Sequence, residues 1–334
     1  MRSPAVDPLV RNQMPELSDA ATVPSELKAL PLPGSGHTWQ RWQALAEVAA
    51  TDLAAVRLGE GHADALAIWS ELAPQRPPPA GDLGVWAAEA PLCGVRATRC
   101  EVGWEVTGTR AWCSGATTLD QALITAHTDE GLRLLMVPLD HARVTVDRGS
   151  WPAVGMARTD SLTVHFDDLV LERDRAIGQP GAYLTRPGFW FGAMGVAACW
   201  YGGAVGVAGT LARSARERPE PHRLAHLGAV DSILTSLLTD LHAAADSIDA
   251  DPFDEKGLAA LRAQRLRASV ERGCEEVLTR TGRATGAGPL CIDGAHARRV
   301  ADLTVYLRQS HAESDLAKLG ELVLDRHSDA GWLG

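Results

Sequence analysis

Residues 107–116 read TGTRAWCSGA and directly follow a run from Val102 to Val106 in which apolar and other residues alternate. Alternation with a period of two is the pattern of a half-buried β-strand. Glycine and serine close the segment, and both favour turns. On this local evidence the segment is a strand that ends in a turn, with Trp112 as a core residue of the strand and Ser114 at the start of the turn.

The β-rich pattern continues on both sides, over roughly residues 83–174. Short runs of apolar and β-branched residues are separated by glycine, aspartate and proline. These runs cover residues 122–126, 132–137, 144–146 and 162–166. No segment with helical periodicity interrupts them, so the sequence predicts a small antiparallel β-barrel or sandwich.

Helical periodicity precedes the β-rich region. Apolar residues recur at three- and four-residue spacing over residues 39–53 and again over residues 63–72. Gly59 and Gly61 are predicted to separate the two helices, because glycine weakens a helix interior. The proline-rich residues 73–84 predict a linker, because proline removes backbone donors.

Long helices are predicted after Pro187. They cover residues 189–218, 222 or 224 to 247, 257–280 and 295–325. Long helices joined by short breaks predict a four-helix bundle. The first of them is the most apolar segment of the chain and carries six glycines, so we expect a buried core helix there rather than a membrane span.

The composition narrows the class of protein. Hydrophobic residues make up 46% of the 334 residues and charged residues 22%, as in an ordinary globular protein. A formal net charge of −10 argues against nucleic acid or an anionic membrane as the main partner. The six cysteines form no C-x-x-C pair, and no apolar signal segment opens the chain. We therefore expect a cytoplasmic protein with no metal site.

Two strings in the β-rich region carry a resemblance to a known family. Residues 104–115 (WEVTGTRAWCSG) are similar to that family's strand, Asn-Gly turn and Trp-Ile-Thr-Asn-Gly sequence. Residues 155–168 (GMARTDSLTVHFDD) are similar to its Gly-Met-Arg-xx-Asp and Phe-Asp-Asp strings. The family is the flavin-dependent acyl-CoA dehydrogenase superfamily, and the order of predicted elements over residues 40–325 matches its order. The chain resembles a short and divergent member.

The resemblance implies an α+β fold in three parts. Residues 1–82 would be a shortened helical N-terminal region with its linker, residues 83–180 a β-barrel that binds the flavin, and residues 181–334 a C-terminal four-helix bundle. It also implies FAD, with FMN as the alternative, and a homodimer or homotetramer that completes each cofactor site across an interface. The expected partners are a small-molecule substrate, such as a CoA or carrier-protein thioester, and an electron-transfer partner.

The resemblance also assigns cofactor contacts. Trp112 would be the apolar plate against the flavin ring, and Ser114 would present its hydroxyl to N5. Arg216 or Arg218 would pair with the cofactor's diphosphate across the interface, since a guanidinium binds phosphate bidentately; the alternative is a solvated basic helix end. The full set is Trp112, Ser114, Gly115, Glu89, Arg216, Arg218, Gly286 and Gly288.

The sequence departs from the family at the catalytic base. Removing the α-proton of a thioester needs a carboxylate, which the family supplies in a Tyr-Glu-Gly-Thr string, whereas residues 309–312 here read QSHA. The nearest ionisable residues are His311, Glu313 and Asp315, and these are the candidate catalytic residues. His311 and Asp315 share a helix face, so a surface histidine paired with Asp315 is the competing interpretation.

Three functions remain open on this evidence. The main one is a flavin-dependent oxidoreductase acting on a CH–CH bond of an acyl thioester or a related substrate. The alternative is a flavin-dependent monooxygenase of the same fold that uses reduced flavin made elsewhere. The third is a non-catalytic descendant that binds an acyl ligand or a partner, which the missing base and the incomplete loop around Glu89 motivate.

Overall fold

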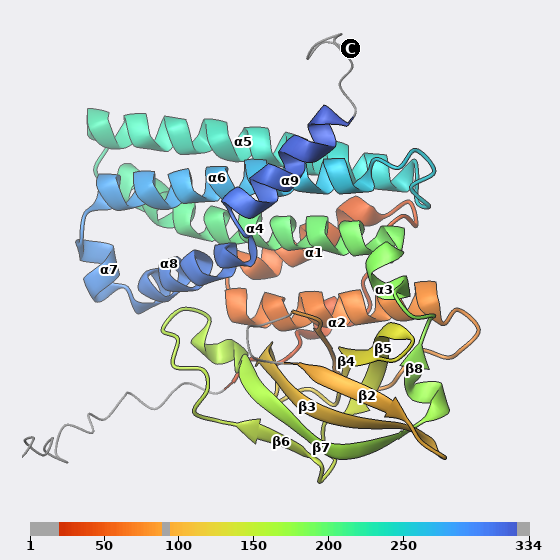
Figure 1. Ribbon diagram of the computed structural model, residues 1–334. Coiled ribbons are helices and arrows are strands. Elements are labelled where there is room, and N and C mark those ends of the chain that lie inside the picture. Colours follow the sequence, from red (N-terminus) through yellow and green to blue (C-terminus); the bar gives the residue numbers. More distant parts are fainter. Residues whose placement is uncertain (1–19, 89–93, 326–334) are drawn as a thin grey trace, which may run out of the picture.

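The computed structural model describes residues 20–88 and 94–325. Within these ranges, helices form one layer and a β-sheet forms the other (Figure 1). The helices are α1 (Thr38–Ala49), α2 (Leu53–Leu72), α3 (Ala182–Thr185), α4 (Pro187–Glu217), α5 (Pro221–Asp249), α6 (Ala259–Thr285), α7 (Gly288–Ile292), α8 (Gly294–Tyr306) and α9 (Glu313–Leu324). The strands are β1 (Leu83–Trp86), β2 (Val95–Arg99), β3 (Gly103–Cys113), β4 (Gln121–Thr128), β5 (Gly131–Pro138), β6 (Val144–Asp147), β7 (Leu162–Glu172) and β8 (Ala176–Ile177).

The N-terminal helices differ from the sequence-based prediction in where the chain breaks. Gly59 and Gly61 lie inside α2, so the predicted break between two helices at these residues is wrong. The break falls before α2, where the Asp52 carboxylate caps the helix by accepting from the backbone N–H of Ala55 at 3.0 Å. A Cβ on Gly59 would overlap the Leu27 side chain. This glycine therefore serves close packing rather than helix termination.

The helical layer is built around α4, which packs against α1, α5, α6 and α8. Trp42 of α1 and Trp200 of α4 belong to the same apolar core. A Cβ on Gly202 would overlap the backbone carbonyl of Ala46, so small residues on α4 allow α1 to approach closely. α4 is long and apolar enough to cross a membrane, but 72% of its most apolar window is buried inside the protein, as in a core helix.

The last predicted helix is divided in two. α8 ends at Tyr306, a 3-10 turn covers Leu307–Gln309, and α9 begins at Glu313. Ser310 between them is extended, and its hydroxyl donates to a carboxylate oxygen of Glu271 on α6 at 2.5 Å. This tie to α6 accompanies a change of chain direction that periodicity alone did not predict.

The sheet runs in the order β6-β7-β3-β2-β4-β5-β8, with β1 paired to β4 off this path. Most neighbours are antiparallel, whereas β4 pairs in parallel with β1 and with β2. The sheet is therefore mixed rather than purely antiparallel. Among the described residues the pairings form an open path from β6 to β8 rather than a closed barrel.

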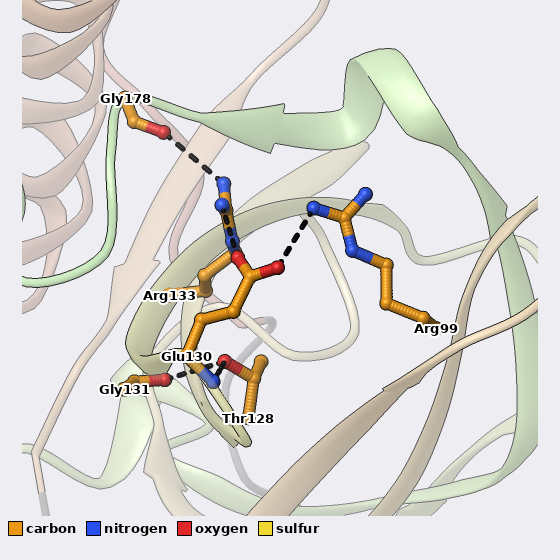
Figure 2. Close-up of polar contacts among 6 residues, drawn as sticks. All are labelled: Arg99, Thr128, Glu130, Gly131, Arg133 and Gly178. Carbon is orange, nitrogen blue, oxygen red and sulfur yellow. Dashed lines mark hydrogen bonds and ion pairs between the residues drawn. The ribbon is translucent and has the colours of Figure 1, made fainter.

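One end of the sheet is held by polar contacts around the β4–β5 turn. Figure 2 shows Glu130 between the guanidinium groups of Arg99 on β2 and Arg133 on β5, at 3.1 and 2.8 Å. Arg133 also donates to the backbone carbonyl of Gly178, just after β8, at 3.3 Å. Both arginines lie over the ring of Trp104. These contacts connect β2, β3 and β5 with the β4–β5 turn and with the residue that follows β8.

α2 lies between the two layers. Its residues Ile68 and Trp69 pack with Leu83, Leu123 and Leu134 of the sheet. Other residues of α2 enter the core of the helical layer. A helix that is covered on both sides has little access to solvent, so polar residues on it need partners or a cavity.

Candidate functional site

A cavity of about 320 Å³ lies where α2 meets β1, β3, α3 and the start of α4. Its charged lining residues are Arg57, Glu60, Asp64 and Arg186, and its aromatic ones are Trp86, Trp112, Tyr183 and Phe189. A larger, open depression of about 620 Å³ lies on the α5–α6 face, and its lining contains no aromatic residue. Only the first of these two combines buried charges with aromatic surfaces, as binding sites commonly do.

Trp112 lies at an irregularity in β3. The register between β3 and β7 shifts between Arg110 and Cys113, and Trp112 has a φ of +59°. A bulky residue in this conformation costs about 1–2 kcal/mol, and an irregularity of this kind redirects a side chain. The indole is 52% exposed and lines the cavity, so the interpretation of Trp112 as a core residue is wrong.

One face of α2 carries the charged part of the cavity. Arg57, Glu60 and Asp64 are spaced three and four residues apart, which places them on the same side of a helix. Arg57 donates to a carboxylate oxygen of Glu60 at 2.7 Å. Glu60 is only 7% exposed, and burial raises the pKa of its carboxyl group above the usual range despite the neighbouring arginine.

Asp64 faces a different cation. Its Oδ1 lies 3.8 Å from Nη2 of Arg186, which precedes α4, and Nη1 of Arg186 is 2.8 Å from a carboxylate oxygen of Glu71. Burial raises the pKa of Asp64, and the coulombic effect of Arg186 opposes this shift only in part. Arg186 itself is 5% exposed. The site therefore holds ionisable groups away from bulk solvent, an arrangement that is frequent at functional sites.

Another part of the lining is aromatic. Tyr183 of α3 and Phe189 of α4 pack edge to face, with ring centroids 5.6 Å apart. The guanidinium of Arg186 lies 5.5 Å from the centre of the Tyr183 ring. Together with Trp112, these rings offer flat apolar surfaces beside the charged residues of α2. The cavity can thus hold a flat ligand that also has polar groups.

Ser114 is buried and belongs to a chain of hydroxyl groups. Its Oγ lies 2.8 Å from Oγ of Ser161, which lies 2.8 Å from Oγ1 of Thr159. Thr159 donates its proton to the carbonyl oxygen of Met156 at 2.7 Å, because a carbonyl can only accept. Ser161 must then donate to Thr159, and Ser114 to Ser161. The free lone pair of Ser114 Oγ is therefore an acceptor rather than a donor.

Gly115 and Glu89 are the predicted cofactor contacts nearest to Ser114 and Trp112 in the sequence. Gly115 has a φ of +73°, and its backbone N–H already donates to the carbonyl of Thr159 at 2.7 Å. A Cβ at this position would overlap Leu58 and Leu119, so the turn requires glycine. Glu89 lies outside the described residues.

The remaining predicted cofactor residues lie at the other end of the molecule. Arg216 and Arg218 are exposed at the end of α4, whereas the cavity lies at its start. At about 1.5 Å per residue, Phe189 and Arg216 are roughly 40 Å apart along the helix. Gly286 follows the end of α6 and Gly288 begins α7, and both are exposed. Within one chain these residues do not reach the cavity, and their predicted role depends on a second copy.

Of the candidate catalytic residues, His311 precedes the last helix, whereas Glu313 and Asp315 belong to its first turn. His311 has 74% of its side chain exposed, and its Nδ1 lies 3.5 Å from the carboxylate of Asp315. Glu313 is exposed in the first turn of α9. Gln309 lines the cavity instead, and Ser310 is bonded to α6. The pairing agrees with the surface-histidine interpretation, and a catalytic role for these residues stays a prediction.

Sequence reasoning missed the charged face of α2 and Arg186. A signal for the first was present, because Arg57, Glu60 and Asp64 follow helical spacing. The predicted break at Gly59 and Gly61 divided the helix and concealed this face. Arg186 had no local signal, since its acidic partners are on α2.

No protein-family model matches this sequence, and no curated protein matches it. Solved structures do resemble the fold. The dibenzothiophene monooxygenase TdsC of Paenibacillus sp. A11-2, solved with FMN and indole, is 22% identical, with a TM-score of 0.76 over 86% of this chain and 83% of that one.

Two further monooxygenases are similar. Methanesulfinate monooxygenase MsuC of Pseudomonas fluorescens is 19% identical, with a TM-score of 0.77 over 90% of this chain and 88% of that one. The HsaA monooxygenase of M. tuberculosis is 16% identical, with a TM-score of 0.70 over 90% and 87%. The α+β fold expected from the sequence resemblance is thereby confirmed: this chain shares with these monooxygenases a helical N-terminal region, a central sheet and C-terminal helices.

Proposed function

We propose that this protein is a flavin-dependent monooxygenase that oxygenates a small, polar aromatic substrate and uses FMN reduced by a separate enzyme. The observation that carries the proposal is the charged face of α2 inside the cavity. Arg57, Glu60 and Asp64 line the cavity together with its aromatic residues. A saturated chain gains nothing from buried ionic groups, whereas a polar ring can hydrogen-bond to them.

The residues at the expected position of the base support the same choice. Acyl-CoA dehydrogenation needs a carboxylate beside the α-carbon. Here Gln309 lines the cavity and Ser310 donates its proton to Glu271. Neither side chain can accept a proton near neutral pH. Oxygen transfer does not depend on a base at this position.

The residues of the cavity fit a flavin. Trp112 presents an exposed indole from a strained backbone position, and such strain at a cavity is typical of a functional residue. The small residues Ala87 and Ala88 line the same cavity. Trp112 would pack against the ring system. Ser114 is buried and is not among the residues that line the cavity, so its contact with the flavin stays a prediction.

Each part of the site then has a task. Reduced flavin supplies the two electrons with which dioxygen is split between the substrate and water. Trp112, Tyr183 and Phe189 bind and orient flat rings, and α2 excludes bulk water while providing polar contacts. TdsC is a monooxygenase that was solved with FMN and with indole, which supports the choice of FMN and of a flat substrate. A second copy of the chain would bring Arg216 and Arg218 to the phosphate.

The test compares two sources of electrons. The purified chain is loaded with FMN or FAD, and oxygen uptake is measured with a flavin reductase and NADH, in the presence of a panel of phenols and indoles. Product is analysed with ¹⁸O₂. We expect one labelled oxygen atom in the product and dependence on the reductase. In parallel, the flavin-loaded chain is mixed with acyl-CoA thioesters without oxygen.

Other outcomes select other functions. Bleaching of the flavin by an acyl-CoA in the absence of oxygen, without labelled product in the first assay, identifies a dehydrogenase and contradicts the proposal. Failure to bind FMN and FAD, in any oxidation state, identifies the non-catalytic binding protein. Oxygen uptake that yields only hydrogen peroxide with every ring tested contradicts the proposed substrate class.

A further inference from the structure

The carboxylate of Asp64 lacks a hydrogen-bond donor among the described residues. Its Oδ1 is buried with no hydrogen-bond partner, and Nη2 of Arg186 lies 3.8 Å away. Among the described residues Oδ2 accepts no hydrogen bond either, and the side chain of Asp64, which is 16% exposed, lines the cavity. A buried carboxylate without donors is costly, so its presence needs a reason.

The neighbouring arginines donate their hydrogen bonds to other carboxylates. Arg186 donates to Glu71 at 2.8 Å, and Arg57 donates to Glu60 at 2.7 Å. Among the groups that line the cavity, two guanidiniums and two carboxylates balance in charge. This charge balance favours a ligand without net charge. The carboxylate oxygen of Asp64 that has no partner requires a hydrogen-bond donor from that ligand.

Glycine on α4 makes room for this carboxylate. A Cβ on Gly192 would lie 2.7 Å from Oδ1 of Asp64 and 3.3 Å from Oδ2. The side chain is therefore confined between α2 and α4, and it has little freedom to turn toward solvent. A confined acceptor discriminates between ligands better than a mobile one does, because less entropy is lost on binding.

We propose that Asp64 determines substrate specificity: its carboxylate accepts a hydrogen bond from a ring N–H or O–H group of a small neutral aromatic substrate bound against Tyr183 and Phe189. This inference rests on the proposed function in that it names the substrate of the same site. Arg186 positions the carboxylate without taking its free oxygen. A carboxylate that accepts such a bond also raises the electron density of the ring, which favours transfer of an electrophilic oxygen atom.

The test measures binding rather than turnover. Indole, 1-methylindole and 3-methylindole are titrated into the FMN-loaded chain by calorimetry, in the absence of a reductant. 1-Methylindole lacks the N–H donor, and 3-methylindole keeps it while carrying the same additional methyl group. We expect indole and 3-methylindole, which both keep the N–H donor, to bind at least about tenfold more tightly than 1-methylindole. This is the gain expected from a hydrogen bond to a buried charge.

Matched variants assign the preference to Asp64. Asp64→Asn should bring the three affinities within about twofold of one another, because the amide directs its oxygen to Arg186 and its NH₂ group to the cavity. Glu71→Gln removes the same charge from the other side of Arg186, outside the cavity lining, and should retain the preference. Circular dichroism establishes that both variants are folded.

The outcomes are independent of oxygenation. Equal binding of the three rings by the unaltered chain, or no binding of any of them, overturns the inference without any variant. A preference that persists in Asp64→Asn also overturns it. Because neither reductant nor turnover is involved, a chain that shows the expected preference but oxygenates nothing contradicts the proposed function and leaves the role of Asp64 intact.

Discussion

The carboxylate of Asp64 on α2 lies 3.8 Å from the guanidinium of Arg186 at the start of α4, and this ion pair joins the two helices at the wall of the cavity. Burial nevertheless raises the pKa of Asp64 above its usual range, although Arg186, Arg41 and Arg57 act to lower it and Glu71 adds to the increase. The charge of this aspartate thus costs stability, as functional residues often do.

The first prediction concerns stability and pH. Folding raises the pKa of this carboxyl group, so at a pH between its unfolded and folded pKa values the folded chain binds more protons than the unfolded chain. The contribution of the group to the free energy of unfolding therefore falls as the pH rises through the folded pKa. The contribution is complete below the unfolded pKa of about 4. Asp64→Asn removes this loss of stability at high pH, because the amide does not ionise. We expect the melting temperature of the variant, relative to the unaltered chain, to be higher at pH 8 than at pH 5.

Differential scanning calorimetry at both pH values checks this. Glu71→Gln is the charge-matched control: it weakens the 2.8 Å pair with buried Arg186 and should lower the melting temperature. If the difference in melting temperature between Asp64→Asn and the unaltered chain is the same at both pH values, Asp64 keeps an ordinary pKa.

The second prediction concerns Trp112. Trp112→Gly relieves a φ of +59° that costs an ordinary residue about 1–2 kcal/mol, and it removes the indole from the cavity. We expect affinity for FMN to fall at least about tenfold, since burying a large side chain contributes about 1.5–3 kcal/mol. The flavin-free chain should be no less stable. Flavin fluorescence titration and thermal unfolding without flavin measure the two effects, and unchanged FMN affinity would remove Trp112 from the flavin site.

The third prediction concerns the hydroxyl chain. If the acceptor lone pair of Ser114 faces N5, it stabilises the reduced flavin, which carries a proton there. Ser161→Ala frees the Ser114 proton to donate to the oxidised flavin. We expect the two-electron midpoint potential to become more negative by about 10–30 mV, the equivalent of one hydrogen bond. Spectroelectrochemistry measures the shift; a positive shift would mean that Ser114 already donates to the flavin.

The fourth prediction concerns packing of α1 against α4. Gly202→Ala places a methyl group against the Ala46 carbonyl, and we expect a loss of about 1–3 kcal/mol in the free energy of unfolding. Gly209→Ala on the same helix meets only the end of the Arg213 side chain at 3.7 Å and should stabilise the chain by up to about 1 kcal/mol. Urea unfolding of both variants is the measurement. If the two variants change the free energy of unfolding equally, the close approach of α1 and α4 at Gly202 is contradicted.

The fifth prediction concerns assembly. Arg216 and Arg218 are far from the cavity of their own chain, so we expect them to complete the site of a second copy. Trp112→Gly and the double variant Arg216→Ala, Arg218→Ala should each bind FMN weakly. After subunit exchange between equal amounts of the two variants, about half of the dimers contain one chain of each. One of the two sites in such a dimer has both native groups, so roughly a quarter of all sites should recover affinity for FMN. No recovery, with exchange verified by mass spectrometry, would exclude the two arginines from the cofactor site.

The sequence predicted those parts of the structure that depend on local pattern. The periods of two and of three to four residues indicated the β-rich middle region and the helices on either side of it, because side-chain periodicity reports which face of an element is buried. It failed where packing opposed local preference. Gly59 and Gly61 suggested a break, but α2 continues through them because Leu27 occupies the space of a Cβ at Gly59.

By itself the sequence determined the order of the elements and the resemblance carried by residues 104–115, which includes Trp112. Only the tertiary structure decided that Trp112 is exposed to a cavity, that Arg216 is at the far end of α4, and that Asp64 and Arg186 face each other. The physical reason is range. Helix and strand patterns arise from neighbours along the chain, whereas a buried charge finds its partner, or is left with a free oxygen for a ligand, only when distant segments pack together.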